Sequence, residues 1–272
     1  MRRIPRIRVY GMEQITGKNN DRVKDAAKLV RSAAYRRETG RFVTEGVRLC
    51  LDALTTGLAP LAAFVTRDRL DRSEKELAPL LDSAGRAFLI GGDAAAKLSD
   101  TQGDQGIFCV WQMLDKSGET DTIKDSGRYI ALENIQNPDN LGACLRTAEA
   151  LGLDGAIVSG GCDLYNPKTL RASMGSALRL PVTRVDSMTE TVPALRDRDF
   201  RVYACVVSGY DMTVLEMDRT AGLVCVIGNE GNGLTPQTAA ACTGRLTIPM
   251  RGRAESLNAA QAAALVMWEM MR

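Results

Sequence analysis

The C-terminal stretch of the chain contains two short apolar runs that each end in a polar loop. The first reads LVCVIGNEGNGLTP over residues 223–236, and the second reads LTIPMRGRAESLN over residues 246–258. Apolar runs of this length that stop at Gly, Pro and Asn predict buried strands. Because open α/β sheets bind ligands at the carboxyl ends of their strands, we expect the two loops to lie next to one another and form a ligand pocket.

Helical and extended patterns alternate along the rest of the chain, which predicts an α/β fold. Residues 1–114 form a first unit of this kind, and residues 128–272 form a second. Residues 115–127 (DKSGETDTIKDSG) are polar, with Ile123 as the one large apolar residue, and are the best candidate for a linker. A surface loop inside a single domain is the alternative.

The charges are distributed unevenly. Residues 1–50 hold 13 Lys and Arg against five Asp and Glu, whereas the remaining residues hold 22 against 28. A basic front end on a chain of formal net charge +2 indicates a polyanionic partner, and nucleic acid is the first candidate. A solvated helix face with a basic tail is the alternative, and charge by itself favours neither.

Composition argues against several classes of protein. Apolar residues make up 45% and charged residues 25% of the 272 residues, as in globular proteins that bury a core. No apolar run reaches the roughly 18 residues that span a bilayer, and the basic N-terminus lacks the apolar region of a signal peptide. Seven scattered cysteines without a C-x-x-C pair are typical of reduced core residues in a cytoplasmic protein. The absence of histidine excludes a Ser-His-Asp triad.

The first set of candidate functional residues lies in NPDNLGACLRTAEALG, residues 137–152. A helix is expected over Leu141–Leu151, with Asn140 at its N-terminal cap. Arg146 places a charge among apolar neighbours on that helix, and it requires a partner because an unpaired buried charge is costly. A phosphate or ribose of a ligand would serve, and so would a structural ion pair with an Asp or Glu.

The second set lies in GNEGNGL, residues 228–234. Its glycines let backbone N–H groups approach a ligand closely. The spacing matches neither G-x-G-x-x-G nor G-x-x-x-x-G-K-[ST], so a phosphate loop is disfavoured. Glu230 would also repel a phosphate, and its carboxylate better suits a cationic or hydrogen-bond-donating ligand.

The third set lies in IPMRGRAESLN, residues 248–258. Ser256 and Asn258 flank Leu257 where the last helix, expected over Ser256–Met271, begins. This is a normal position for helix caps, so capping is the alternative to a catalytic role. The helix is apolar nearly all round, and we expect the core or another subunit to bury it.

Together the three sets resemble the motifs of a known family. ENIQNPDNLGACLRTAEALG (133–152), VCVIGNEGNGLT (224–235) and IPMRGRAESLNAAQAAAL (248–265) are similar, in order and character, to the three motifs of the SpoU (TrmH-like) class of the SPOUT superfamily. These proteins are S-adenosylmethionine-dependent RNA ribose 2′-O-methyltransferases. The front unit, with VKDAAKLVRSAAYRRETGRFVTEGVRLCLDAL (23–54), also resembles the substrate-binding domain of two-domain, rRNA-type members, which is similar to ribosomal proteins that bind kinked RNA.

The resemblance implies a plan for the whole chain. Residues 1–114 would be a smaller α/β RNA-binding domain resembling kink-turn-binding ribosomal proteins, and residues 115–127 a linker. Residues 128–272 would be an α/β trefoil-knot (SPOUT) methyltransferase domain, one of the few exceptions to the rule against knotted chains. The resemblance also implies a homodimer formed through the knot domain, with the site at the subunit interface.

The resemblance further implies a cofactor and a set of site residues. S-adenosylmethionine would sit bent in the knot, held largely by backbone groups. The implied cofactor-binding residues are Val207, Ser208, Gly209, Gly228, Asn229, Gly231, Ile248, Met250 and Leu257. The catalytic positions of the family are matched by Asn140, Arg146, Glu230, Ser256 and Asn258. The loop Arg251–Glu255 varies within the family and is expected to touch RNA.

The implied chemistry needs no metal, because a ribose 2′-hydroxyl attacks a methyl group that is already activated. Alignment of the reacting groups can contribute ~7–11 kcal/mol in favourable cases. A base must still accept the hydroxyl proton, and proposals for the family assign this role to the arginine that matches Arg146. A guanidinium with a pKa above ~12 is a poor base. We therefore expect Arg146 to clamp the target phosphate or ribose, and Glu230 to organise the site by pairing with Arg146 or Asn140.

Ribosomal RNA is favoured over tRNA as the substrate, because the two-domain layout resembles rRNA-type members. Two other functions are compatible with the same residues. One is a non-catalytic RNA-binding or ribosome-assembly factor that keeps the fold, which the basic first unit supports equally well. The other is a nucleotide-binding α/β enzyme that uses GNEGNG as a phosphate loop.

Overall fold

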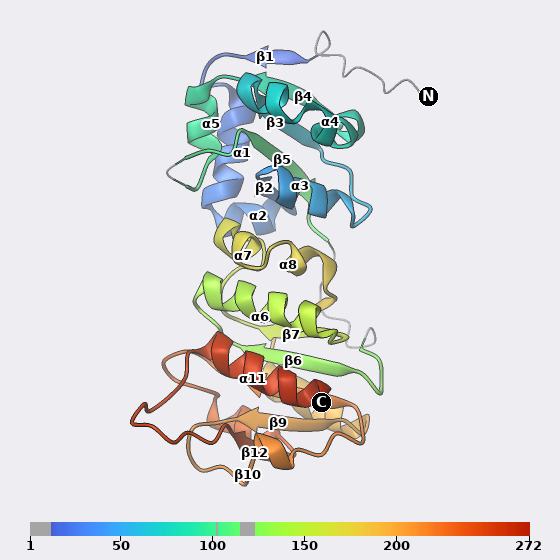
Figure 1. Ribbon diagram of the computed structural model, residues 1–272, viewed down its shortest axis with the longest axis vertical. Helices are drawn as coiled ribbons and strands as arrows, with labels where there is room; N and C mark the ends of the chain where they lie inside the picture. The colour runs from blue at the N-terminus through green and yellow to red at the C-terminus, as the bar shows by residue number, and fades with distance from the viewer. Residues whose placement is uncertain (1–11, 102, 115–122) are drawn as a thin grey trace. The chain divides into compact units, whose positions relative to one another are not determined.

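The computed structural model describes residues 12–101, 103–114 and 123–272. The chain divides into two compact units, one formed by Met1–Leu114 with Tyr165–Leu170, the other by Asp115–Leu164 with Arg171–Arg272. Both units are α/β, which confirms the fold class predicted from the alternating patterns (Figure 1). Residues 1–11 and most of the expected linker, residues 115–122, lie outside the described residues.

The first unit contains a five-stranded sheet in the order β1-β4-β3-β5-β2. Its strands are β1 (Glu13–Ile15), β2 (Arg41–Glu45), β3 (Ala62–Thr66), β4 (Ala87–Ile90) and β5 (Ile107–Gln112). Strand β5 runs antiparallel to β2 and β3, and the other pairs are parallel. Two pairs of helices pack on the sheet, namely α1 (Asp21–Arg31) with α5 (Gly92–Leu98), and α3 (Val47–Leu54) with α4 (Arg67–Ser83) (Figure 1).

The basic helix that the spacing after Asn20 predicts is present, but it is interrupted. The Asn20 side chain caps α1 by accepting a hydrogen bond of 2.9 Å from the Arg22 amide. The helix ends at Arg31, because Ser32 takes an extended conformation and caps a second helix, α2 (Ala33–Thr39). A serine that caps the following helix cannot also continue the preceding one.

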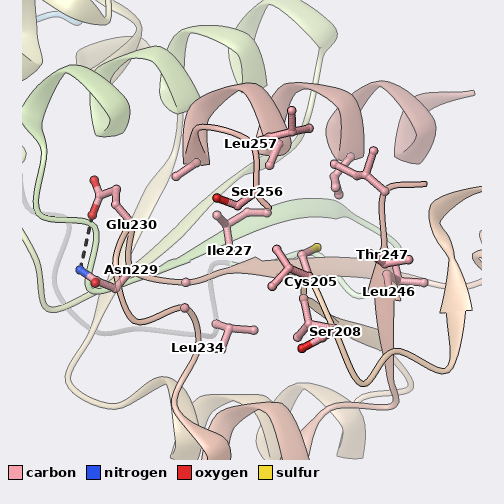
Figure 2. Close-up of a pocket in the computed structure, with 18 of the residues that line it drawn as sticks. Cys205, Ser208, Ile227, Asn229, Glu230, Leu234, Leu246, Thr247, Ser256 and Leu257 are labelled. Atoms are coloured by element: carbon pink, nitrogen blue, oxygen red, sulfur yellow. Dashed lines mark hydrogen bonds between the residues drawn. The ribbon is translucent and has the colours of Figure 1, made fainter. Parts of the chain in front are cut away.

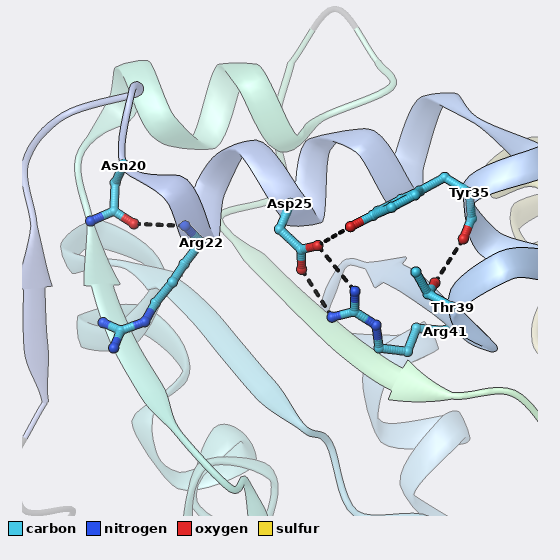
Figure 3. A network of polar contacts seen from close by, with 6 residues as sticks. All are labelled: Asn20, Arg22, Asp25, Tyr35, Thr39 and Arg41. Atoms are coloured by element: carbon cyan, nitrogen blue, oxygen red, sulfur yellow. Dashed lines mark hydrogen bonds and ion pairs between the residues drawn. The ribbon is translucent and has the colours of Figure 1, made fainter.

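A carboxylate network ties α1 and α2 to β2. Asp25 accepts two hydrogen bonds from the Arg41 guanidinium, at 2.9 and 3.0 Å, and one of 2.6 Å from the Tyr35 hydroxyl (Figure 3). Burial raises the pKa of Asp25, but the hydrogen bonds from Arg41 and Tyr35 and the charge of Arg41 outweigh it, so the pKa lies below its ordinary value. A cation therefore neutralises this carboxylate directly.

The second unit contains a seven-stranded sheet in the order β10-β12-β9-β11-β6-β7-β8, and every pair is parallel. Its strands are β6 (Arg128–Glu133), β7 (Gly155–Ser159), β8 (Val182–Val185), β9 (Arg201–Cys205), β10 (Met212–Thr213), β11 (Leu223–Ile227) and β12 (Gly244–Thr247). All five residues of the central strand β11 are buried, as its apolar run predicted. A parallel sheet of this kind is covered on both faces, so its strands read as continuous apolar runs.

Helices cover the second sheet in two groups. Helix α6 (Pro138–Leu151) packs beside α11 (Ala259–Met271) (Figure 1). Helix α9 (Met188–Asp197) packs beside α10 (Pro236–Ala241). The core buries one side of α11, but Leu265 and Trp268 remain 48% and 61% exposed within one chain. None of the helices in the described parts of the chain combines the length and apolar character needed to cross a bilayer.

The start of α6 corrects one prediction. The helix begins at Pro138 rather than Leu141, and its cap is Asn137, whose side chain accepts a hydrogen bond of 2.9 Å from the Asp139 amide. Proline at the first helical position has a suitable φ and needs no hydrogen-bond acceptor, so it extends the helix toward the N-terminus. Asn140 is therefore not the cap, and its side chain is available for other contacts.

Other boundaries were also misplaced. Helix α11 begins at Ala259, with Asn258 as its cap, so Ser256 lies in the preceding loop. Strand β9 ends at Cys205, so Val207 and Ser208 lie in the segment that follows it. Two short helices, α7 (Pro167–Ala172) and α8 (Ser176–Arg179), are separated because Met174 and Gly175 adopt left-handed conformations with φ of 50° and 85°.

Candidate active site

The loops after β9, β11 and β12 line one cavity of about 480 Å³ (Figure 2). Strands β11 and β12 are not neighbours in the sheet, because β9 lies between them. The expected pair of loops is thus a set of three, all at the carboxyl edge where α/β sheets bind ligands. The first turns of α11 close the cavity through Ala259 and Ala262. Its size is within the range of small-molecule sites, ~300–1,000 Å³.

The turn after β11 is closed by its own backbone. The Asn229 amide donates to the Gly233 carbonyl at 3.0 Å, and the Gly233 amide donates back to the Asn229 carbonyl at 2.9 Å. A Cβ atom at Gly228 would lie 2.2 Å from the Gly233 carbonyl carbon, so only glycine fits at the base of the turn. These glycines therefore serve a narrow, self-paired turn rather than an open phosphate loop.

The Glu230 carboxylate holds this turn against the start of α6. It accepts hydrogen bonds from the Gln136 and Asn137 amides at 3.0 and 2.9 Å, and from the Asn140 side chain at 3.0 Å. Burial raises the pKa of Glu230, but these hydrogen bonds outweigh burial and lower the pKa below its ordinary value. All three donors are neutral, so the carboxylate keeps its negative charge beside the cavity.

Asn140 extends the network to the third loop. Its amide nitrogen donates to Glu230, so its carbonyl oxygen is free to accept, and it accepts a hydrogen bond of 3.0 Å from the Asn258 side chain. The Asn258 side-chain oxygen in turn accepts hydrogen bonds from the Ala260 and Gln261 amides at the start of α11. One hydrogen-bonded chain, Glu230–Asn140–Asn258, thus joins residues from all three motifs.

Arg146 does not follow the expectation of a buried charge. It is exposed on α6, while Leu145 and Ala148 on the same helix are buried. It does not line the cavity, and no hydrogen bond or ion pair to its side chain is found among the described residues. The expected pairing of Glu230 is therefore with Asn140 and not with Arg146 inside one chain.

The structure brings most of the predicted site residues together. The cavity is lined by Val207, Ser208, Gly228, Asn229, Glu230, Gly231, Ile248, Met250, Ser256 and Leu257. Gly209, Asn140, Arg146 and Asn258 do not line it. Gly209 lies in the turn just beyond Ser208, with a φ of 63°, and Asn140 and Asn258 reach the cavity only through Glu230 and α11.

Several residues that line the cavity were not among the site residues predicted from the sequence. They include Cys205, Val206, Leu246 and Thr247 at the strand ends, and Ala259, Ala262 and Val266 on α11. The alanines at positions 259 and 262 are one helical turn apart, so the apolar pattern already placed them on one face. Nothing in the pattern showed that this face meets the loops rather than the sheet.

Two buried cysteines of the second unit do not have the character of nucleophiles. None of the seven cysteines forms a disulfide. Burial, together with the charge of Glu230, raises the pKa of Cys144 to about 12, and burial likewise raises the pKa of Cys242 to about 12. A thiol with so high a pKa is protonated at neutral pH and is not a good nucleophile.

Comparison with protein families identifies the class to which this fold and cavity belong. The SpoU rRNA methylase family matches residues 127–268, and the MRM3-like substrate-binding domain matches residues 20–109. The chain belongs to the SpoU rRNA methylase family. It is 28% identical to the 23S rRNA (guanosine(2553)-2′-O)-methyltransferase RlmP of Bacillus subtilis, over 95% of this chain and 99% of the relative.

Solved structures of the class are similar over nearly the whole chain. The SpoU methyltransferase AviRb of Streptomyces viridochromogenes, in complex with its cofactor AdoMet (S-adenosylmethionine), has a TM-score of 0.83 at 27% identity, covering 93% of this chain and 97% of that one. The AdoMet-bound rRNA methyltransferase of Sinorhizobium meliloti also has a TM-score of 0.83, at 26% identity, covering 95% and 97%. The predicted family and enzyme class are confirmed.

Proposed function

We propose that the protein transfers a methyl group from S-adenosylmethionine to a ribose 2′-hydroxyl of ribosomal RNA. The observation that carries the proposal is the Glu230–Asn140–Asn258 chain beside a cavity lined by three loops. The activity of RlmP, a 23S rRNA 2′-O-methyltransferase that this chain matches almost from end to end, supports ribosomal RNA as the substrate. A tRNA substrate is the second possibility to be tested.

The cavity suits the proposed cofactor in charge and in shape. Glu230 and Glu255 both line it, and their carboxylates complement a cationic ligand. Gly228 keeps the turn narrow at its base, because a Cβ atom there would meet the Gly233 backbone. When bound, S-adenosylmethionine supplies a methyl group activated by a positively charged sulfur. The exposed side chains of Val207 and Met250 would cover its apolar parts.

The residues of the network would act by alignment. Glu230 fixes the turn relative to α6, and Asn258 fixes the last loop relative to the same helix. Holding the reacting groups in place in this way lowers the barrier without a metal. Arg146, exposed and charged, is suited to clamp the phosphate or ribose of the target nucleotide. Ser256 faces the cavity beside them.

The domain plan and the assembly are part of the same proposal. Residues 1–114 would bind RNA as a domain resembling kink-turn-binding ribosomal proteins, residues 115–127 would be a linker, and residues 128–272 would form the knotted domain. A homodimer through that domain would cover Leu265 and Trp268 and would bring Arg146 of one copy to the cavity of the other. The exposure of these three side chains within one chain supports this arrangement. The protein would act in the cytoplasm, where ribosomal RNA is found.

Two measurements test the proposal. Isothermal titration with S-adenosylmethionine should show binding, because a non-catalytic assembly factor need not bind it. Ribose methylations mapped in RNA from cells with and without the gene should differ at an rRNA nucleotide. A difference confined to tRNA would identify tRNA as the substrate. Preferential binding of ATP or NAD would instead support a phosphate-binding turn at residues 228–233.

The role of Arg146 can be tested separately. Arg146→Lys keeps the charge but removes the planar fork that binds a phosphate with two hydrogen bonds. We expect slower methyl transfer with an unchanged pH dependence, because the guanidinium is not the base. Near-normal turnover by the variant would remove Arg146 from the mechanism, and a pH profile that shifts toward the ordinary range of lysine would restore it as the base.

A further inference from the structure

Glu133 is a buried carboxylate outside the network described above. It is the last residue of β6, and it is 7% exposed. Its neighbour Leu132 is paired in register with Ile227, so Glu133 lies where Gly228 begins the turn on the adjacent strand. A carboxylate taken out of water is costly unless hydrogen-bond donors surround it. The donors that Glu133 has gathered therefore reveal what it holds in place.

The donors of Glu133 all come from the segment that leaves the turn. The Thr235 amide donates to one carboxylate oxygen at 2.9 Å, and the Thr238 hydroxyl donates to the other at 2.5 Å. The Thr235 hydroxyl lies 3.2 Å from that second oxygen. Thr238 is completely buried, and its hydroxyl is also 2.9 Å from that of Thr189 on α9. Glu133 thus fixes the start of α10.

This anchor complements the one that Glu230 provides. Glu230 fixes the outer part of the turn, after Gly228, against the start of α6. Glu133 fixes the segment just after the turn, because Thr235 follows Leu234 directly in the chain. Leu234 and Ala239, on either side of the anchored threonines, both line the cavity. Glu133 lies at the start of the connection between β6 and α6, and Glu230 binds amides at the end of that connection. The two carboxylates therefore hold two different parts of the turn.

We propose that Glu133 and Thr238 are positioning residues that preorganise the turn 228–234 for the cofactor. Neither lines the cavity, so they act through Leu234, Ala239 and the turn and not by contact. Removing the anchor should let the turn sample other conformations, and cofactor binding would then have to restore the right one. The loss should therefore appear in cofactor affinity and not in the rate at saturation. This inference rests on the proposed function.

The experiment compares Thr238→Val with Thr238→Ser. Valine has nearly the same shape but cannot donate to Glu133, whereas serine keeps the hydroxyl. For Thr238→Val we expect Kd and KM for S-adenosylmethionine to rise about tenfold, with kcat within about twofold of the wild type. Thr238→Ser should recover most of the affinity. Amide exchange at Gly233 in the ligand-free protein should be faster in Thr238→Val, because the turn opens more often.

A matched control separates positioning from general stability. Thr191 is another buried threonine of the same unit, and its hydroxyl donates to the carbonyl of Ser187, the N-cap of α9, and not to Glu133 or the turn. Thr191→Val should leave cofactor affinity unchanged. Glu133→Gln provides a second variant at the anchor itself, with the same expected rise in Kd.

Each outcome bears on the inference. It is overturned if Thr238→Val binds the cofactor as well as the wild type, if Thr238→Ser is as weak as Thr238→Val, or if Thr191→Val weakens binding equally. A fall in kcat of about tenfold in Thr238→Val, with an unchanged Kd, would assign Thr238 to catalysis instead of positioning. A wild-type protein that binds no S-adenosylmethionine would refute the proposed function itself, which is a different result.

Discussion

The two units each contain a carboxylate at the centre of a polar network, and the two networks differ in their donors. Asp25 in the first unit is bound by the Arg41 guanidinium through two hydrogen bonds, with Tyr35 as a third partner (Figure 3). Glu230 in the second unit is bound by two backbone amides and the side chain of Asn140. One carboxylate is neutralised, and the other keeps its charge.

This difference shows how to distinguish structural from functional carboxylates. Both side chains have a pKa below the ordinary value, so the pKa direction alone does not separate them. The donors do. The Asp25–Arg41 ion pair joins α1 to β2 and presents no net charge. Neutral donors stabilise the charge of Glu230 without cancelling it, which leaves a negative group available to a cationic ligand at the cavity.

The largest expected effect comes from removing the charge that distinguishes Glu230. Glu230→Gln keeps the shape of the side chain but replaces one carboxylate oxygen by an NH2 group. That group is a donor and would face the donors that bind Glu230. We expect kcat/KM for methyl transfer to fall roughly 100-fold, since hydrogen bonds to charged groups contribute ~1.5–3 kcal/mol. Steady-state kinetics with saturating RNA would measure it. Unaffected methyl transfer in this variant or in Glu230→Ala would remove Glu230 from site organisation.

A smaller effect should follow when the far end of the same network is cut. Asn258→Asp keeps an oxygen that can cap α11 but loses the amide that donates to Asn140. We expect activity to fall about tenfold with a Tm close to that of the wild type, because the cap survives. Asn258→Ala should show both the lost activity and a lower stability of about 1 kcal/mol. If Asn258→Asp retains full activity, capping is the whole role of Asn258.

Breaking the neutralised network should affect stability and not chemistry. Asp25→Asn removes the charge that binds Arg41, and since the Arg41 and Asp25 side chains are 26% and 34% exposed, solvent screens much of the interaction. We expect a loss of about 0.5–1 kcal/mol in the free energy of unfolding, with unchanged affinity for S-adenosylmethionine. Urea titration and calorimetry measure the two quantities. A large loss of cofactor affinity would contradict the contrast between the two carboxylates.

The smallest expected effect is the pH dependence of that stability. The pKa of Asp25 in the folded protein lies below its ordinary value of 3.8. The contribution of Asp25 is therefore fully present above that value and is lost as the pH falls through the lower, folded pKa. The difference in unfolding free energy between wild type and Asp25→Asn should be constant from pH 7 to pH 5 and shrink in strong acid. A difference that shrinks already near neutral pH would contradict this assignment.

Local pattern was sufficient where one residue type permits one conformation. The apolar runs at 223–227 and 246–248 predicted strands β11 and β12, and Asn258, one of two cap candidates for the last helix, is the cap that the structure uses. The pattern failed where two local signals compete. Asn137 and Asn140 are both good caps, and Pro138 decides between them by starting the helix at once. Ser32 ended a helix whose apolar spacing continued.

The sequence by itself determined the fold class, the strands that end in glycine-rich or proline-containing loops, and, through its motifs, the family. Only the tertiary structure decided which groups meet. It placed β9 between β11 and β12, so three loops line the cavity, and it joined Asn140 to Glu230 and Asn258 while leaving Arg146 exposed. It also revealed Glu133 as an anchor of the turn. The reason is that strand order and hydrogen-bond partners depend on contacts between residues about 100 positions apart, which no local period records.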